Sequence, residues 1–121
     1  MHATVWKQLY LVSKDSVKIL LLENIEIADT CARRMKGLLG RRGLFESSGM
    51  VITPCNYVHT FGMKFNIDIV FIDKHYHVVG LKRGVKKNKI SGVVRAKHTL
   101  EISEGNIDAL QINLGDKLVW L

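Results

Sequence analysis

The residues best suited to chemistry in this sequence are a histidine and an aspartate within a largely apolar run. From Cys55 to Phe71 the odd-numbered positions are mostly apolar or aromatic, and His59 shares their parity, while Asp68 lies between two isoleucines. An imidazole on an apolar strand face is unfavourable unless a partner satisfies it, and a carboxyl group close to a core strand is expected to have a perturbed pKa. We therefore identify His59 and Asp68 as candidate residues for ligand binding or proton transfer.

Both residues also have a purely structural interpretation. His59 could be a core histidine hydrogen-bonded to the backbone, and Asp68 could hold backbone N–H groups or an arginine such as Arg34 or Arg41 at a turn. On an unbroken strand the two side chains would be roughly 30 Å apart, so they form a dyad only where the chain folds back. Cys55 would lie about 13 Å from His59 on such a strand, which disfavours a direct thiolate–imidazole pair.

The leading functional hypothesis is a small, noncatalytic binding domain with a cleft around His59. Such a cleft would have apolar walls, Asp68 at its edge and two arginines available to a small anionic ligand. Besides His59 and Asp68, the predicted ligand-binding set is Cys55, Phe61, Met63, Arg34 and Arg41. The enzymatic alternative is a hydrolase or lyase with His59 as base and Asp68 as its orienting partner.

Standard catalytic and cofactor motifs are absent from the sequence. None of G-x-G-x-x-G, G-x-x-x-x-G-K-[ST], H-E-x-x-H or G-x-S-x-G occurs, which weakens four common enzyme classes and leaves others open. The histidines at 59, 75, 77 and 98 share no recognised metal-ligand spacing, and the two cysteines, Cys31 and Cys55, are not closely paired. We accordingly predict no metal and no cofactor.

The excess positive charge of the chain arises from one segment. Eighteen Lys and Arg against eleven Asp and Glu give a net charge of +7, and seven of the bases fall in residues 82–98, which contain no acid. These seven are Lys82, Arg83, Lys86, Lys87, Lys89, Arg95 and Lys97. The segment is interpreted as a solvated loop, or alternatively as a surface for nonspecific nucleic-acid or acidic-protein binding. It has no aromatic residues for base stacking, so sequence-specific recognition is not expected.

The elements that must position these residues are mostly short strands. Apolar segments around the turn-like SKDS predict a first hairpin, and IDIVFID followed by YHVVGLK predicts a second. The alternating run predicts strands with the odd positions inward, interrupted near residues 62–66. HTLEIS and GDKLVWL predict two further strands near the C-terminus.

Two short helices are expected, near residues 29–39 and 105–112. In the first, Cys31, Met35, Leu38 and Leu39 fall on one helical face, with Asp29 or Thr30 as N-cap, and glycines end it. In the second, Ser103 is the predicted N-cap.

Length and composition indicate one globular domain spanning residues 1–121. The chain is 47% hydrophobic, no apolar stretch reaches the roughly 18 residues of a membrane-spanning helix, and the N-terminus lacks the apolar core of a signal peptide. With only two cysteines, a reducing cytoplasm is the expected location, without membrane association. Seven or so short strands and one or two short helices predict a mainly β fold, either an antiparallel β-sandwich or a closed barrel.

From about Ile27 to the C-terminus the chain resembles the uncharacterised "domain of unknown function, family 192". The resemblance is carried by Arg34, Gly37-Leu38, Arg41, Gly49-Met50, Cys55, His59, Thr60, Phe61, Met63, Phe65, Ile67, Asp68, Phe71, Leu100-Glu101 and Gly115-Asp116. It implies a compact, mainly β sandwich-like domain without an established activity. The chain departs from the family at Asn66, where proline is frequent, and at residues 74–76, where a glycine is frequent in the hairpin.

Overall fold

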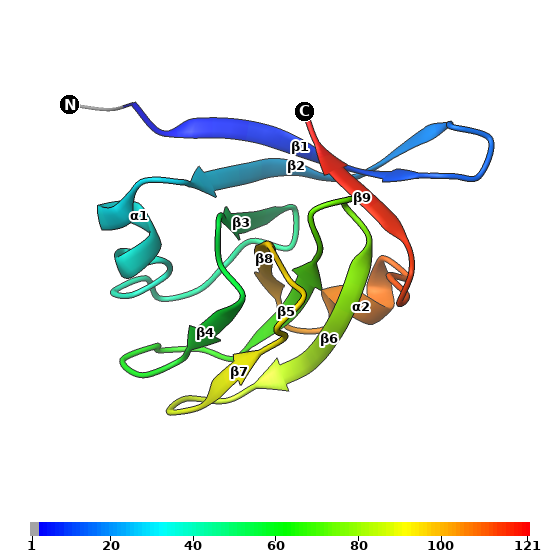
Figure 1. Cartoon of the computed structure of the whole chain (residues 1–121). Coiled ribbons are helices and arrows are strands. Elements are labelled where there is room, and N and C mark those ends of the chain that lie inside the picture. Colours follow the sequence, from blue (N-terminus) through cyan, green and yellow to red (C-terminus); the bar gives the residue numbers. More distant parts are fainter. Residues whose placement is uncertain (1–2) are drawn as a thin grey trace.

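The computed structural model describes residues 3–121 (Figure 1). Along the described chain the elements are β1 (Val5–Val12), β2 (Lys18–Ala28), α1 (Cys31–Lys36), β3 (Ser48–Ile52), β4 (Tyr57–His59), β5 (Ile67–Ile72), β6 (Val78–Val85), β7 (Ile90–Gly92), β8 (His98–Ser103), α2 (Asn106–Ala109) and β9 (Lys117–Trp120). The protein is therefore mainly β, as predicted, with two short helices. Neither helix of the described chain has the length and apolar character needed to cross a membrane.

Seven strands form one large sheet in the order β6-β5-β8-β3-β2-β1-β9, and β4 pairs with β7 in a separate two-stranded sheet. Both predicted hairpins are confirmed, as β1–β2 and β5–β6. The expectation of a purely antiparallel sheet is wrong, because β2 and β3 run parallel. The connection between them contains α1, and a parallel pair needs such a long crossover. The alternative of a closed barrel is also wrong, since the edge strands β6 and β9 share no ladder. An isolated bridge joins His77, just before β6, to Lys117 of β9.

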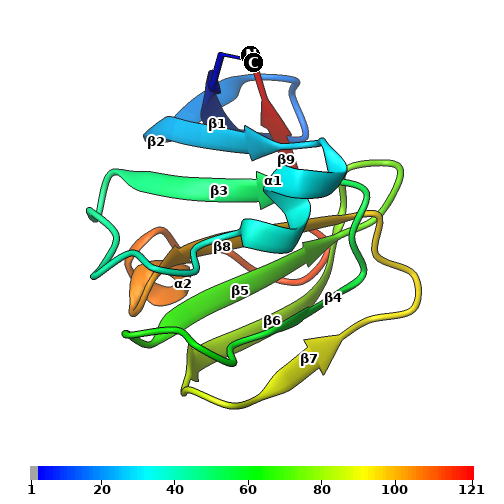
Figure 2. The ribbon, with the colours of Figure 1, turned by 90° about the vertical axis from the view of Figure 1, so that its left-hand side faces the viewer.

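The core consists of two apolar clusters, one on each side of the large sheet. One cluster includes Ile107 of α2, and the other includes Leu38 after α1 together with Val58 of β4. Figure 2 shows α1, β4 and β7 on the side facing the viewer, with α2 behind. Strand β5 is consequently buried on both faces. The predicted inward orientation therefore holds for Ile69 and its odd-numbered neighbours, but the even-numbered positions of β5 are buried equally well.

Helix α1 is shorter and less buried than its sequence pattern indicated. The Thr30 hydroxyl accepts a hydrogen bond from the Arg33 N–H at 3.2 Å, so of the two predicted N-cap candidates, Asp29 and Thr30, the second is the cap. The helix ends at Gly37, whose φ of 47° suits a residue without a side chain. None of its six residues is buried, and Met35 is 74% exposed. The expected apolar face is thus anchored through Leu38, beyond the helix end, and not through Cys31 or Met35.

Candidate ligand-binding pocket

A pocket of about 450 Å³ lies between α1, the turn that follows it, β4 and the large sheet. The α1 side contributes Arg34 and Met35, β4 contributes Val58 and His59, and β8 contributes Glu101. Its size falls within the usual range for small-molecule sites. The pocket exists because the β2–β3 crossover carries α1 over one face of the sheet while the separate β4–β7 pair covers the neighbouring part.

Glu101 is the most unusual group in this pocket. It lies in the middle of β8, opposite Met50 of β3 and Ile69 of β5, and is 4% exposed. Among the described residues it has no hydrogen-bond or ion-pair partner, and burial raises the pKa of its carboxyl to about 7. A Cβ atom placed on Gly37 would be 3.8 Å from Glu101 Oε1, so the end of α1 lies directly beside the carboxyl.

Arg34 supplies a second incompletely satisfied group. Its Nη1 donates to the carbonyl of Pro54 at 3.3 Å, which ties α1 to the segment before β4. Its Nε is buried and lacks a hydrogen-bond partner within the described chain. A guanidinium keeps its charge at all physiological pH values, and a buried donor without an acceptor is unfavourable.

His59 lies on β4 with an orientation opposite to the predicted one. Tyr57 and His59 are exposed, and Val58 between them is buried. The reason is that β4 pairs with β7 instead of joining the large sheet, and it packs onto the core through its even-numbered residue. The His59 ring stacks on Phe61 with 5.5 Å between ring centroids, and it still lines the pocket.

The structure brings four of the seven predicted ligand-binding residues to one pocket: Arg34, Cys55, His59 and Met63. Cys55 is half-buried, and its thiol donates to the Tyr57 carbonyl at 2.8 Å. Two other predicted members lie outside the lining. Phe61 is exposed and stacks on His59, and Arg41 forms an ion pair of 2.6 Å with Glu26.

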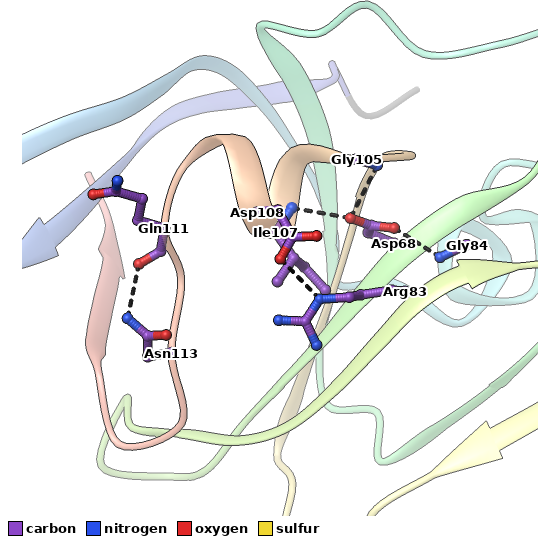
Figure 3. A network of polar contacts seen from close by, with 8 residues as sticks. All are labelled: Asp68, Arg83, Gly84, Gly105, Ile107, Asp108, Gln111 and Asn113. Carbon is purple, nitrogen blue, oxygen red and sulfur yellow. Dashed lines mark hydrogen bonds and ion pairs between the residues drawn. The ribbon is translucent and has the colours of Figure 1, made fainter.

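Asp68 is not part of this pocket and has a structural role (Figure 3). Its Oδ1 accepts from the Gly84 N–H at 2.8 Å, and its Oδ2 accepts from the N–H groups of Gly105 and Ile107 at 3.1 and 2.9 Å. Asp68 thus caps α2 from a different strand, in place of the predicted Ser103, and α2 itself has Gly105 at its N-cap without a side-chain bond. His59 and Asp68 are not brought together as a catalytic dyad.

Sequence reasoning did not select Glu101 as a site residue. On HTLEIS the polar side chains Thr99, Glu101 and Ser103 alternate with apolar ones, which is the pattern of a strand with one solvent face. In the structure both faces of β8 are covered, and five of its six residues are buried. A signal was available in hindsight, because Glu101 belongs to the residues that carry the family resemblance.

The basic segment 82–98 is not a single loop. It contains the end of β6, a turn at residues 86–89, and β7. Thr60 holds that turn, since its hydroxyl donates to the Lys86 carbonyl and accepts from the Lys89 N–H at 2.9 Å. All seven predicted basic residues are exposed, and Arg83 pairs with Asp108 at 2.9 Å.

Within residues 3–121, no three His, Cys, Asp or Glu side chains are grouped closely enough to hold a metal ion.

Two solved structures share this fold. One is a Sinorhizobium meliloti 1021 protein described as a candidate transcription regulator, with a TM-score of 0.84 and 17% identity over 99% of this chain and 97% of that one. The other, a protein of unknown function from Novosphingobium aromaticivorans, has a TM-score of 0.82 and 20% identity over 98% of this chain and 94% of its own. At these identities the likeness concerns the fold alone.

Sequence comparison leads to a family. UPF0127 proteins of Thermococcus sibiricus and Thermococcus kodakarensis are 31% and 27% identical to this chain over 100 residues, which is 79% of it. The matched part is 65% and 64% of their own lengths, so this chain spans just under two thirds of these relatives. The family model DUF192, described as "Uncharacterized ACR", matches residues 12–120. The chain belongs to the uncharacterised family DUF192, as its sequence resemblance indicated.

Proposed function

We propose that this protein is a small-ligand-binding domain and that the pocket between α1 and β8 is its binding site. The observation that carries the proposal is the buried, unpartnered Nε of Arg34 on the wall of a 450 Å³ pocket. Buried donors almost always have an acceptor, and exceptions call for a missing partner. A carboxylate or phosphate of a ligand would supply the acceptor and match the charge of the guanidinium.

The other walls fit a ligand with an apolar body. Leu38, Ile52, Val58 and Met63 are buried and line the pocket. His59 at the rim adds an imidazole that can donate or accept a hydrogen bond. Apolar walls with a few convergent polar groups are typical of sites that fix the orientation of a small molecule.

Binding can be tested by NMR titration of the ¹⁵N-labelled protein with benzoate and phenylphosphonate, two anions on an apolar ring. We expect shifts confined to amides of α1, Gly37 and β4, and at least a tenfold loss of affinity for Arg34→Gln. Arg42→Gln is the matched control, because Arg42 is an exposed arginine outside the pocket lining. Equal binding by both variants, or no localised shift with either anion at millimolar concentration, would refute the proposal.

A second candidate function rests on the basic segment. Its seven cations are exposed on β6, in the turn between β6 and β7, and in the segment between β7 and β8. Of these seven, Arg83 is the one with an ion pair to a described residue. A nonspecific surface for nucleic acid or an acidic protein would use such cations to displace counterions. The affinity for duplex DNA should then fall steeply between 50 and 200 mM salt. Replacement of Lys86, Lys87 and Lys89 by Gln should lower it, and unchanged binding would eliminate this candidate.

For the location of the protein we retain the cytoplasm, on the support of its two free cysteines. A free thiol in a pocket wall persists most readily in a reducing compartment. Fractionation of native cells checks this, with recovery outside the cytoplasmic fraction as the contrary outcome.

A further inference from the structure

Within residues 3–121, no side chain forms an ion pair or hydrogen bond with the Glu101 carboxyl. The residues opposite it on β3 and β5 are Met50 and Ile69, which cannot form a hydrogen bond with a carboxylate. On its own strand, the Thr99 hydroxyl donates to the Cys55 carbonyl at 2.9 Å. The carboxyl therefore lines the pocket without a partner among the described residues, and Glu101 as a whole is only 4% exposed.

Charged and titratable groups from other elements also surround the pocket, but none neutralises Glu101. These groups are Arg34, Lys36, Cys31, Cys55, Tyr57 and His59. None of them forms a hydrogen bond or ion pair with the carboxyl, and burial is the sole cause of its raised pKa. A cation beside the carboxyl would lower that pKa, so neither Arg34 nor Lys36 is close enough to compensate the charge of Glu101.

The same pocket thus presents two unsatisfied groups of opposite sign, a buried guanidinium Nε and a buried carboxyl. Resting on the proposed function, we infer that the ligand is zwitterionic. Its anionic group binds Arg34, and an amine, amidine or guanidine at its other end pairs with Glu101. Charge-assisted hydrogen bonds of this kind are about twice as strong as neutral ones and satisfy both groups together.

Pairing of a ligand cation with Glu101 is coupled to the ionisation of the Glu101 carboxyl. In the unliganded pocket Glu101 is mostly protonated below pH 7. A bound cation favours the carboxylate, so binding at pH 6 releases close to one proton from Glu101 into solution. The affinity for the zwitterion consequently rises with pH through 7 and levels off above about pH 8. Between pH 6 and pH 7.5 the ionised fraction of the free carboxyl increases about eightfold, which sets the expected gain in affinity.

The test uses three probes on the same apolar ring: 4-(aminomethyl)benzoate, 4-methylbenzoate and benzylamine. Calorimetry at pH 7.5 should show the zwitterion binding about tenfold more tightly than 4-methylbenzoate, with benzylamine weaker than both. At pH 6, titrations in two buffers of different ionisation enthalpy should report proton release for the zwitterion and none for 4-methylbenzoate, which has no cation to pair with Glu101. Glu101→Gln should abolish both the preference and the proton release, whereas the exposed Glu23→Gln should retain them.

An NMR measurement reports the ionisation of Glu101 directly. The ¹³C resonance of the Glu101 carboxyl should titrate near pH 7 in the free protein and below pH 5.5 with the zwitterion bound. If the zwitterion and 4-methylbenzoate bind with equal affinity, and Arg34→Gln weakens the binding of both, this inference is overturned and the proposed binding function stands. Failure of all three probes to bind the pocket would overturn both.

Discussion

Asp68 and Glu101 are two buried carboxyl groups on adjacent strands of one sheet, yet their surroundings are opposite. Asp68 on β5 faces α2 and accepts three backbone N–H bonds, whereas Glu101 on β8 faces the pocket and accepts none. Because Glu101 lies opposite Ile69, the next residue after Asp68, the two side chains are on opposite faces of the sheet. The comparison shows that two equally buried carboxyl groups can differ completely in their hydrogen bonding. It is the missing partner, and not burial, that makes Glu101 the candidate for ligand binding.

The largest change in stability should come from replacing Asp68, the carboxyl whose hydrogen bonds are all made. Asp68→Ala removes the acceptor for three backbone donors and uncaps α2, so we expect a loss of about 3 to 5 kcal/mol in the free energy of unfolding. Urea denaturation measures it. Asp68→Asn retains one acceptor oxygen and should lose less. A loss below 1 kcal/mol for Asp68→Ala would show that these bonds are not structural.

Replacement of Glu101, the carboxyl without a partner, should have the opposite effect on stability. Between pH 4.5 and 7 the unfolded chain has released the Glu101 proton while the folded protein keeps it, so the folded state loses stability as pH rises through this window. The shift corresponds to about 3 kcal/mol, fully expressed above pH 7. Glu101→Gln should therefore stabilise the unliganded protein at pH 8 relative to wild type, and less so at pH 5.

The difference between wild type and variant is the quantity to measure, because His98 titrates in the opposite sense. Burial lowers the pKa of His98, so its contribution improves as pH rises through the same region. Denaturant unfolding at pH 5, 6.5 and 8 gives this difference. A Glu101→Gln variant that is less stable than wild type at pH 8 would mean that the carboxylate has a partner in the unliganded protein.

An intermediate effect is expected at Gly37, which lies beside Glu101 at the end of α1. A side chain is strained at its positive φ, and an added Cβ would contact Ile52 and Glu101 at 3.7 and 3.8 Å. Gly37→Ala should cost about 1 to 2 kcal/mol in unfolding free energy. Gly43→Ala is the control, because Gly43 has neither a positive φ nor a close neighbour. Equal stability of the two variants would contradict the strain.

The smallest effect is expected at the ion pair beside Asp68. Arg83 and Asp108 are 2.9 Å apart in the same region as the Asp68 bonds (Figure 3), but both side chains are more than half exposed. Solvent screens such pairs, so Arg83→Gln should change the unfolding free energy by less than about 0.5 kcal/mol. Thermal unfolding at low and high salt checks this. If Arg83→Gln lowered the unfolding free energy as much as Asp68→Ala, the hydrogen bonds around Asp68 would depend on the charge of Arg83.

The contrast between the two carboxyls also marks what the sequence could predict. The hairpins, both helix positions, the Thr30 cap and the break after β4 follow from local patterns. The structural alternative for Asp68, an acceptor for backbone N–H groups, also describes the bonds that it forms. The hairpins, helices, cap and break depend on residues close together in the chain, and the Asp68 interpretation depends on a single polar group in an apolar strand. Both kinds of signal can be recognised in the sequence.

The rest depends on contacts between distant segments. The parallel β2–β3 pair arises from the path of a crossover, which no local pattern records. The crossover then covers a face of β8 that alternation predicts as solvated, and so hides Glu101. The predicted orientation of His59 was wrong because β4 has only three residues and pairs with β7, outside the large sheet. The alternation between odd and even positions in residues 55–71 therefore does not continue through β4 with the same faces inward.

The exposure of α1 has a consequence for how quickly the pocket can exchange its contents. A helix that buries none of its six residues loses little apolar contact when it unfolds locally, while β8 cannot separate from its neighbours without disrupting the core. The amide hydrogens of α1 should therefore exchange with deuterium orders of magnitude faster than those of β8. One wall of the pocket can open on its own between the Thr30 cap and the buried Leu38, and the sheet that carries Glu101 remains folded.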